Sequence, residues 1–435
     1  MKFNPDRRRL LSSLAAGAGV LPFAMGMPPA FATRGGERKR LLVVMVEGGW
    51  DVTYCMDPKQ GLDTVDGPEI DEDPNLKDDR EAVETLNGHP IMVNDVKRPS
   101  VRSFFQQYGQ RVAVVNGLWI GAIAHATARI RILNGTPLER DPSWAAIAGV
   151  AHGVDLPLGS VDLSGGSYVG DLAASAGQLG VQAQLKALLD DTAEFPPIAG
   201  WEARPSFRLD NGDREALFAH LNARNDAVRS GARLPNDESF FDDRAEALDR
   251  AHRFRDQGAD AVSQLTLGIT PSFRDQLALA VQLLNTDLCS AVTVDSGQVW
   301  DTHRDNVLQH KGLEGVFSGL LSLGQMLDDN DMWDDTLVAV ISEMTRTPTF
   351  NSTLGKDHWP HTSCLLMGRQ VVGGRAYGGT DDRVESLTLD PVTGTPDPKG
   401  RLNKYDNFAA GVLASLDVDP EPHYPTIDPF LAWRG

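Results

Sequence analysis

Seven side chains of types that commonly bind metal ions come shortly after hydrophobic segments of this sequence. They are Asp51, Asp301, His303, Glu343, Asp357, His358 and His361. Mixed carboxylate and imidazole ligands suit zinc, manganese or a similar divalent ion. Two such ions about 4 Å apart can hold an in-line displacement at phosphorus or sulfur. If the fold brings these residues together, the set predicts a metal site.

Each of these residues also has an ordinary structural explanation. Asp51 could cap the helix that follows it, and the other residues could belong to unrelated polar loops. Glu343 is harder to explain in this way, because a charge next to a buried strand needs a partner. Pro360 lies between His358 and His361, so a loop rather than a helix has to bring them together. For the seven residues taken together, we favour metal binding over unrelated positions in polar loops.

The hydrophobic segments predict the elements that would position these residues. Short apolar runs, most of them containing valine, indicate buried strands at residues 41–46, 112–115, 291–294, 336–341 and 364–368. Helical patterns lie at 122–133, from Thr270-Pro271 to 288, at 316–327 and at 406–416. This alternation predicts an α/β fold with a mostly parallel sheet and helices on both faces. In such sheets the active crevice lies beyond the carboxyl ends of the strands, where the candidate ligands would meet.

Two segments do not fit the alternation of strands and helices. Residues 56–100 are acidic and rich in turns, and we interpret them as an insertion into a domain that spans 40–435. Asp71, Asp73 and Asn75 resemble the start of an EF-hand calcium loop. Leu76 stands where glycine is required and Ala82 where the closing glutamate belongs, so the segment does not predict a calcium site. Residues 150–265 are polar, with helical stretches at 212–230 and 243–257, and indicate a variable insertion or cap.

The first 32 residues have the pattern of a twin-arginine export signal. Arg7-Arg8 is followed by an apolar run over 14–27 and by Ala30-Phe31-Ala32, a typical cleavage site. The alternative is an uncleaved anchor, but the run is shorter than the roughly 20 residues that span a bilayer. Residues 33–39 would form a linker. We therefore expect a periplasmic or secreted protein, exported in the folded state and without a transmembrane span after cleavage.

Composition and the absence of certain motifs argue against several classes of function. A net charge of -19 repels nucleic acids. Three cysteines give no disulfide framework. Gly165-Gly166-Ser167-Tyr168-Val169 lacks the last glycine of a nucleophile elbow, so a serine hydrolase is weakly supported. No phosphate-binding loop or dinucleotide motif is present.

Several short motifs occur in an order and spacing that resemble a known family. They are LVVMVEGGWD at 42–51, WDTH at 300–303, SEMTRTP at 342–348, KDHWPHTSCLLMG at 356–368, GGRAYGG at 373–379 and NFAAGVLASLDVDP at 407–420. The sequence resembles the secreted family catalogued as domain of unknown function 1501, within the alkaline phosphatase and sulfatase superfamily. The resemblance implies an alkaline-phosphatase-like or sulfatase-like α/β domain with an inserted region.

The resemblance also implies two metal sites. Asp51 and Glu343 would serve one metal ion, and Asp301, His303 and His361 the other. Met344 stands where the superfamily usually has a histidine, and methionine does not replace imidazole for a hard cation.

The same resemblance places a Ser or Thr nucleophile just before His125, where this chain has Ala124. Thr127 is the nearest hydroxyl group. Asp357 and His358 would replace lost ligands, and His125 could join them. Arg346 could bind the oxygens of a substrate anion.

Two functions follow as hypotheses. The first is an exported hydrolase of phosphate or sulfate esters that depends on zinc, manganese or calcium, with Thr127, His125 and Arg346 as catalytic candidates. Its partner would be a small anionic ester. The second is a non-catalytic exported protein that keeps the hydrolase fold and binds an envelope protein. Ala124 and Met344 favour this second hypothesis.

Overall fold

The computed structural model describes residues 39–173, 175–178, 211–231, 235–263, 272–368 and 370–435. The expected export signal, most of the expected linker and the expected helix start at Thr270-Pro271 lie outside these ranges. Within the described ranges, no helix combines the length and the apolar character needed to cross a membrane.

The core of the fold is one sheet of eight strands in the order β12-β4-β11-β8-β1-β7-β5-β6. Their bounds are β1 Arg40–Met45, β4 Val112–Trp119, β5 Ser160–Asp162, β6 Ala176–Gln178, β7 Ala291–Asp295, β8 Thr336–Ile341, β11 His361–Met367 and β12 Arg375–Gly378. β1 pairs in parallel with β7 and β8 at the centre of the sheet. β11 runs antiparallel to both of its neighbours, β8 and β4. The other strands all run in one direction, which confirms the mostly parallel α/β fold.

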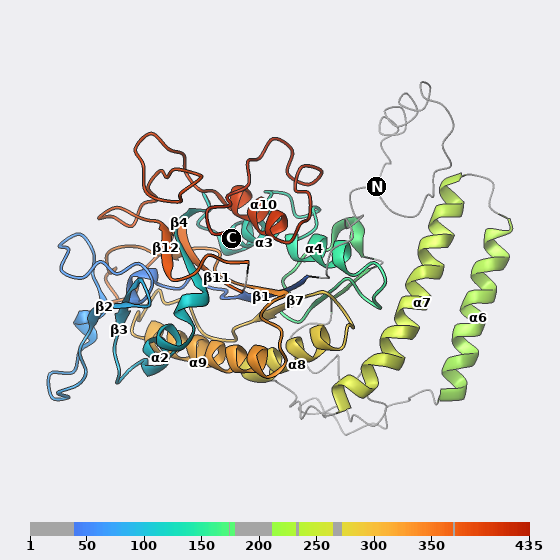
Figure 1. Cartoon of the computed structure of the whole chain (residues 1–435), viewed down its shortest axis with the longest axis horizontal. Helices are drawn as coiled ribbons and strands as arrows, with labels where there is room; N and C mark the ends of the chain where they lie inside the picture. The colour runs from blue at the N-terminus through green and yellow to red at the C-terminus, as the bar shows by residue number, and fades with distance from the viewer. Residues whose placement is uncertain (1–38, 174, 179–210, 232–234, 264–271, 369) are drawn as a thin grey trace.

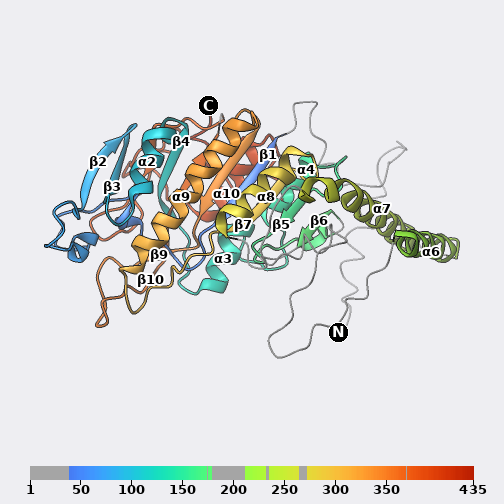
Figure 2. The same ribbon diagram turned by 90° about the horizontal axis from the view of Figure 1, so that it is seen from below.

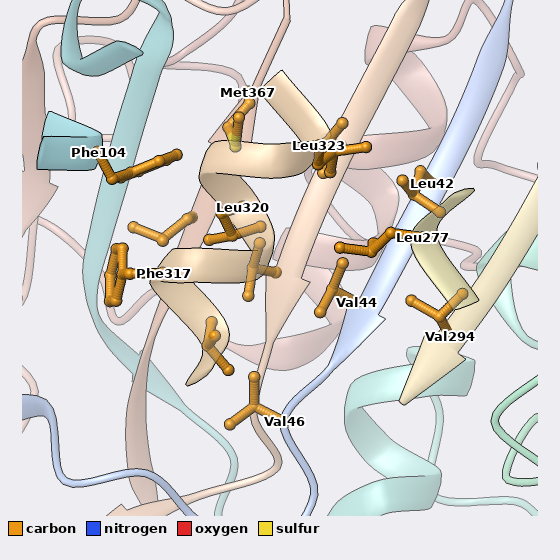
Figure 3. Close-up of a cluster of buried hydrophobic side chains, with 14 of the residues drawn as sticks. Leu42, Val44, Val46, Phe104, Leu277, Val294, Phe317, Leu320, Leu323 and Met367 are labelled. Carbon is orange, nitrogen blue, oxygen red and sulfur yellow. The ribbon is translucent and has the colours of Figure 1, made fainter. Parts of the chain in front are cut away.

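Helices cover both faces of this sheet, as Figure 1 shows. α2 (Pro99–Tyr108), α8 (Phe273–Asn285) and α9 (Leu308–Asp329) pack on one face. α3 (His125–Asn134), α4 (Trp144–His152) and α10 (Tyr405–Ser415) pack on the other. Successive side chains of β1 therefore enter different cores: Leu42 and Val44 contact the first layer, and Leu41 and Val43 the second. Figure 3 shows the first core, in which Leu42 and Val44 meet Leu277 of α8. This alternation is what a strand buried on both faces requires.

The segment 150–265 differs in part from the expectation that it lies outside the sheet. β5 and β6 come from this segment and extend the sheet beyond β7. Each of these strands has three residues, too few for a hydrophobic pattern to show in the sequence. Other described residues of the segment form α6 (Asn211–Arg229) and α7 (Pro235–Ser263), which project from the sheet (Figures 1 and 2).

The acidic segment 56–100 contains regular structure. β2 (Ala82–Leu86) and β3 (His89–Val93) form an antiparallel hairpin. Short 3-10 helices occur here and elsewhere in the described chain: η2 Val52–Tyr54, η3 Pro68–Asp71, η4 Gly109–Arg111 and η5 Gly170–Leu172. A two-stranded ribbon of β9 (Thr345–Arg346) and β10 (His358–Trp359) completes the strands.

Candidate metal centre

Four chain segments bring polar side chains to one edge of the sheet. His125 begins the helix after β4, Asp301 and His303 follow β7, and Glu343 follows β8. These strands run in the same direction, so their carboxyl ends share an edge. His358 comes from the segment before β11, and its amino end lies at this edge because β11 runs the opposite way. The reversed strand therefore brings a histidine to this edge that a fully parallel sheet would place elsewhere.

The small β9–β10 ribbon fixes the position of His358 within this group. His358 pairs with Arg346 across the ribbon, and Trp359 pairs with Thr345. The backbone N–H of Thr347 also donates to the carbonyl of Asp357, over 2.8 Å. These contacts hold the loop before β11 against the segment that follows β8.

Three imidazole rings point their Nε2 atoms at one carboxylate oxygen. Oδ1 of Asp301 lies 3.4 Å from Nε2 of His125, 3.1 Å from that of His303 and 3.2 Å from that of His358. The Nε2 atoms of His303 and His358 lie 2.8 Å apart. Ligand-type atoms of His125, Asp301 and His358 all lie within 4.8 Å of one another. Oδ1 of Asp301 therefore lies within 3.4 Å of three imidazole nitrogens.

The other ring nitrogen of each histidine faces a hydrogen-bond acceptor. Nδ1 of His125 lies 2.7 Å from Oε1 of Glu343, and Nδ1 of His303 lies 2.8 Å from Oδ1 of Asp357. Nδ1 of His358 lies 2.6 Å from the carbonyl oxygen of Ile123. An acceptor at Nδ1 places the proton there, which leaves the Nε2 lone pair facing inwards. Metal-bound histidines commonly have this arrangement, often with a carboxylate as the acceptor.

This donor set fits a divalent cation. Lone pairs on three nitrogens and one carboxylate oxygen repel one another unless a positive charge lies between them. A proton bridges only one pair of these atoms, and Nε2 of His125 is buried without a hydrogen-bond partner. Donor atoms around a tetrahedral zinc ion lie roughly 3.3 Å apart, because each bond is about 2.0–2.1 Å long. The three separations from Oδ1 of Asp301 and the separation between Nε2 of His303 and Nε2 of His358, which run from 2.8 to 3.4 Å, are close to that value.

The protonation states of these residues also suit metal binding. Burial alone would raise the pKa of Asp301, but the hydrogen bond and charge of Arg346 outweigh it and lower the pKa to about 2. Asp301 is therefore an anion at neutral pH. Burial lowers the pKa of His358 and favours its neutral form. The hydrogen bond with Glu343 raises the pKa of His125, so a metal ion would compete with a proton at that ring.

Arg346 is buried beneath the centre and holds it together. Its guanidinium group donates to Oδ1 of Asp301 over 2.8 Å and to the carbonyl of Gly49 over 2.9 Å. It also donates to the carbonyls of Gly48 and Lys356. The side chain is fully buried. This position does not support the expectation that Arg346 binds the oxygens of a substrate anion; it makes Arg346 a positioning residue for Asp301.

Asp51 lies in a separate buried ion pair. Its Oδ2 is 2.8 Å from Nζ of Lys356 and accepts a hydrogen bond from Asn306. Its Oδ1 accepts from the hydroxyl and the backbone N–H of Thr53 and so caps η2. Both side chains of the ion pair are fully buried. The structure therefore shows the capping alternative, and an ammonium group already neutralises the Asp51 carboxylate.

His361 is held away from the group of three rings. Its Nδ1 lies 2.6 Å from the hydroxyl of Ser386 and also accepts the backbone N–H of Ser386. Burial lowers the pKa of His361 to about 4. These contacts place His361 with Ser386 rather than with Asp301.

The remaining candidates also lie outside the donor set. Thr127 is exposed on α3, and Ala124 caps that helix without a side-chain hydrogen bond. Met344 is buried in the core beneath α3 and α10. Glu343 and Asp357, expected as ligands, are instead bonded to histidine Nδ1 atoms.

The sequence did not predict the groups that form hydrogen bonds to the histidines of the centre. The side-chain amide of Asn351 donates to the carbonyl of His303 over 2.8 Å, and the carbonyl of Ile123 faces His358. Backbone carbonyls and loop amides carry no pattern of their own. The only usable signal was the general rule that a buried charge needs a partner, which could have suggested an acidic partner for Lys356.

Comparison with known proteins gives one family. A model of the family described as "Protein of unknown function (DUF1501)" matches residues 38–397. No protein with a curated function matches the chain.

The chain is similar to several solved structures at low sequence identity. A protein in the alkaline phosphatase superfamily from Vibrio parahaemolyticus is 10% identical, with 91% of this chain and 70% of that chain covered and a TM-score of 0.40. The lipoteichoic acid synthase LtaP from Listeria monocytogenes is 10% identical, with 90% and 74% covered and a TM-score of 0.33. The PsFucS1 sulfatase from Pseudoalteromonas sp. is 9% identical, with 90% and 70% covered and a TM-score of 0.33.

Proposed function

The chain belongs to the protein family of unknown function DUF1501, and from the geometry of its polar centre we propose that it is a metal-dependent hydrolase of phosphate or sulfate esters. The observation that carries this proposal is the convergence of three Nε2 atoms on Oδ1 of Asp301. The ligands would be Asp301, His125, His303 and His358. This set is rich in nitrogen, which favours zinc or manganese over calcium, because calcium takes oxygen ligands.

In this proposal some residues of the centre bind the metal ion directly, and others orient or ionise those that do. When bound, a divalent ion polarises an ester oxygen and lowers the pKa of a bound water molecule. Glu343 and Asp357 orient two of the rings, and Arg346 keeps Asp301 ionised. Ala124 supplies no hydroxyl group and Thr127 points to solvent, so water is the nucleophile in this proposal.

Metal analysis together with turnover tests the proposal. Protein purified without chelators is expected to hold about one divalent ion per chain and to hydrolyse aryl phosphate or aryl sulfate esters. Asp301→Asn and His303→Ala should lose both properties, whereas His220→Ala, on the exposed side of α6, should keep them. A chain that binds no zinc, manganese, calcium or magnesium and turns over neither ester would contradict the proposal.

A non-catalytic role in the cell envelope is the second candidate. The burial of Arg346 and the alanine at position 124 favour it, because the centre then lacks an obvious group for binding a substrate anion. In this case the metal would stabilise a surface that binds an envelope protein. Retained metal, absent turnover and a partner lost on Asp301→Asn substitution would support this role.

Export by the twin-arginine route forms part of the same proposal. It is motivated by Arg7, Arg8 and the sequence Ala30-Phe31-Ala32. The double substitution Arg7→Lys and Arg8→Lys should retain the precursor in the cytoplasm, while Lys2→Arg should not. Periplasmic delivery of the double variant would contradict this part.

A further inference from the structure

We propose that the centre takes esters with an apolar alcohol part, and that Leu354, Ile123 and Val299 contact that part. This inference rests on the proposed hydrolase function. In the reaction, the oxygen of water bonds to phosphorus or sulfur and the bond to the ester oxygen breaks. The alcohol leaves with one hydrogen of the water, and the other goes with the phosphate or sulfate.

The first support is where the most exposed hydrophobic side chains lie. Among the described residues, the large hydrophobic side chains that are more than half exposed are Val392, Val299, Leu354, Ile70, Phe240 and Ile123. Val299 precedes Asp301 by two positions, Ile123 precedes His125 by two, and Leu354 precedes Asp357 by three. Single exposed hydrophobic residues are ordinary. These three differ from scattered positions in that each lies within three residues of a side chain of the centre or of Asp357, which is bonded to His303.

Hydrogen bonds tie two of these positions to the centre. The carbonyl of Ile123 is the acceptor for Nδ1 of His358, 2.6 Å away. In the loop that carries Leu354, the hydroxyl of Thr353 and the amide of Asn351 both donate to the carbonyl of His303, over 2.9 and 2.8 Å. The backbone of Ile123 and the residues just before Leu354 are therefore fixed relative to two histidines of the centre.

The backbone of Leu354 is the second support. Its φ angle is +61°, in the left-handed region that glycine and asparagine adopt most readily. Its side chain is also 65% exposed. A leucine is unfavourable here on both counts in the free protein, since its Cβ is strained and its apolar surface faces water. Contact with an apolar group of the substrate explains why leucine occupies position 354, because that contact removes its exposed surface from water.

The occupant follows from the two chemistries that the same chain segments carry. The metal centre suits the anionic head of an ester, and the three hydrophobic side chains suit an alkyl or aryl alcohol part. A small polar alcohol would leave Leu354, Ile123 and Val299 in water and gain nothing from them.

Leu354→Asn separates this role from a structural one. Asparagine tolerates the left-handed backbone but removes the apolar contact. For the metal-loaded full chain, kcat/KM for 2-naphthyl phosphate should fall on the order of ten-fold, mainly through KM. The value for methyl phosphate should not change. Leu354→Gly should show the same loss of selectivity together with a higher Tm, because glycine relieves the strained backbone.

Thr426→Gly is the matched control. Thr426 is exposed, has a φ angle of +66° and lies in the C-terminal segment. Its substitution should raise Tm in the same way and leave the ratio of the two substrates unchanged.

Two results separate this inference from the function on which it rests. If the wild-type chain hydrolyses both esters and Leu354→Asn leaves their ratio unchanged, the inference is overturned and the hydrolase function stands. Binding of 2-naphthyl and methyl phosphonates to the metal-loaded chain supplies the same comparison without turnover. Equal affinity of the wild-type chain for the two phosphonates would overturn the inference in that assay.

Discussion

Nδ1 of His125 lies 2.7 Å from Oε1 of Glu343, although 218 residues separate the two along the chain. The same oxygen accepts the backbone N–H of Gly48 over 2.8 Å. The Glu343 side chain is fully buried, so these protein groups replace its contacts with water. One buried carboxylate thereby joins the start of α3, the end of β8 and the loop after β1.

Glu343→Gln should weaken metal binding with little effect on folding. Glutamine keeps the size and an acceptor oxygen but removes the charge that makes the His125 ring more basic. Loss of such an outer contact typically lowers metal affinity about 10–100-fold. Competition with a chelator measures the change, with the exposed Glu385→Gln as control. Unchanged affinity in Glu343→Gln would show that this contact does not tune the ion.

His361→Asn should leave the metal content as it is, in contrast to His303→Ala. Ser386 holds Nδ1 of His361 through its hydroxyl and its backbone N–H, and no contact in the described structure links that ring to Asp301. Elemental analysis of the two variants beside the wild type gives the answer. Loss of metal from His361→Asn would return this residue to the ligand set that the family resemblance implies.

Lys356→Met should destabilise the fold strongly. The substitution leaves the Asp51 carboxylate buried without its cation, and breaking such a buried pair typically costs about 3–5 kcal/mol. Adding Asp51→Asn should restore much of the loss, because the unpaired charge is then gone. Urea unfolding measures both changes. Lys39→Met breaks an ion pair whose aspartate is exposed and should cost less than about 1 kcal/mol; an equal cost for the two lysines would contradict the assignment.

Asp295 should make stability depend on pH between about 4 and 6. Burial raises its pKa to about 6, and the nearby charges of Glu47, Glu343 and Asp162 add to the effect. The folded state therefore holds the proton more tightly than the unfolded state, and stability falls as pH rises through this window. Asp295→Asn should remove that fall and stabilise the chain by about 1–3 kcal/mol at pH 8, with no gain at pH 3.5. Denaturation of both forms at the two pH values tests this, and a gain of equal size at pH 3.5 would refute it.

Local sequence patterns predicted much of the framework. The runs at 41–46 and 336–341 correspond to β1 and β8, and the stripe of Val316, Leu320, Leu323 and Leu327 corresponds to the buried face of α9. These elements are long enough for side-chain periodicity to reveal which face is buried. β5 and β6 escaped notice because three residues give no period, and nothing in the sequence of β11 marks it as antiparallel.

The sequence by itself determined the α/β framework and the types of side chain placed at one sheet edge. Only the tertiary structure decided how those side chains pair: three imidazoles with Asp301, Asp51 with Lys356, and His361 with Ser386. The physical reason is that periodicity reports which face of an element is buried, whereas a hydrogen bond depends on distances between atoms of segments far apart in the chain. The reversed direction of β11 illustrates this, because it places His358 beside residues that follow β7 and β8.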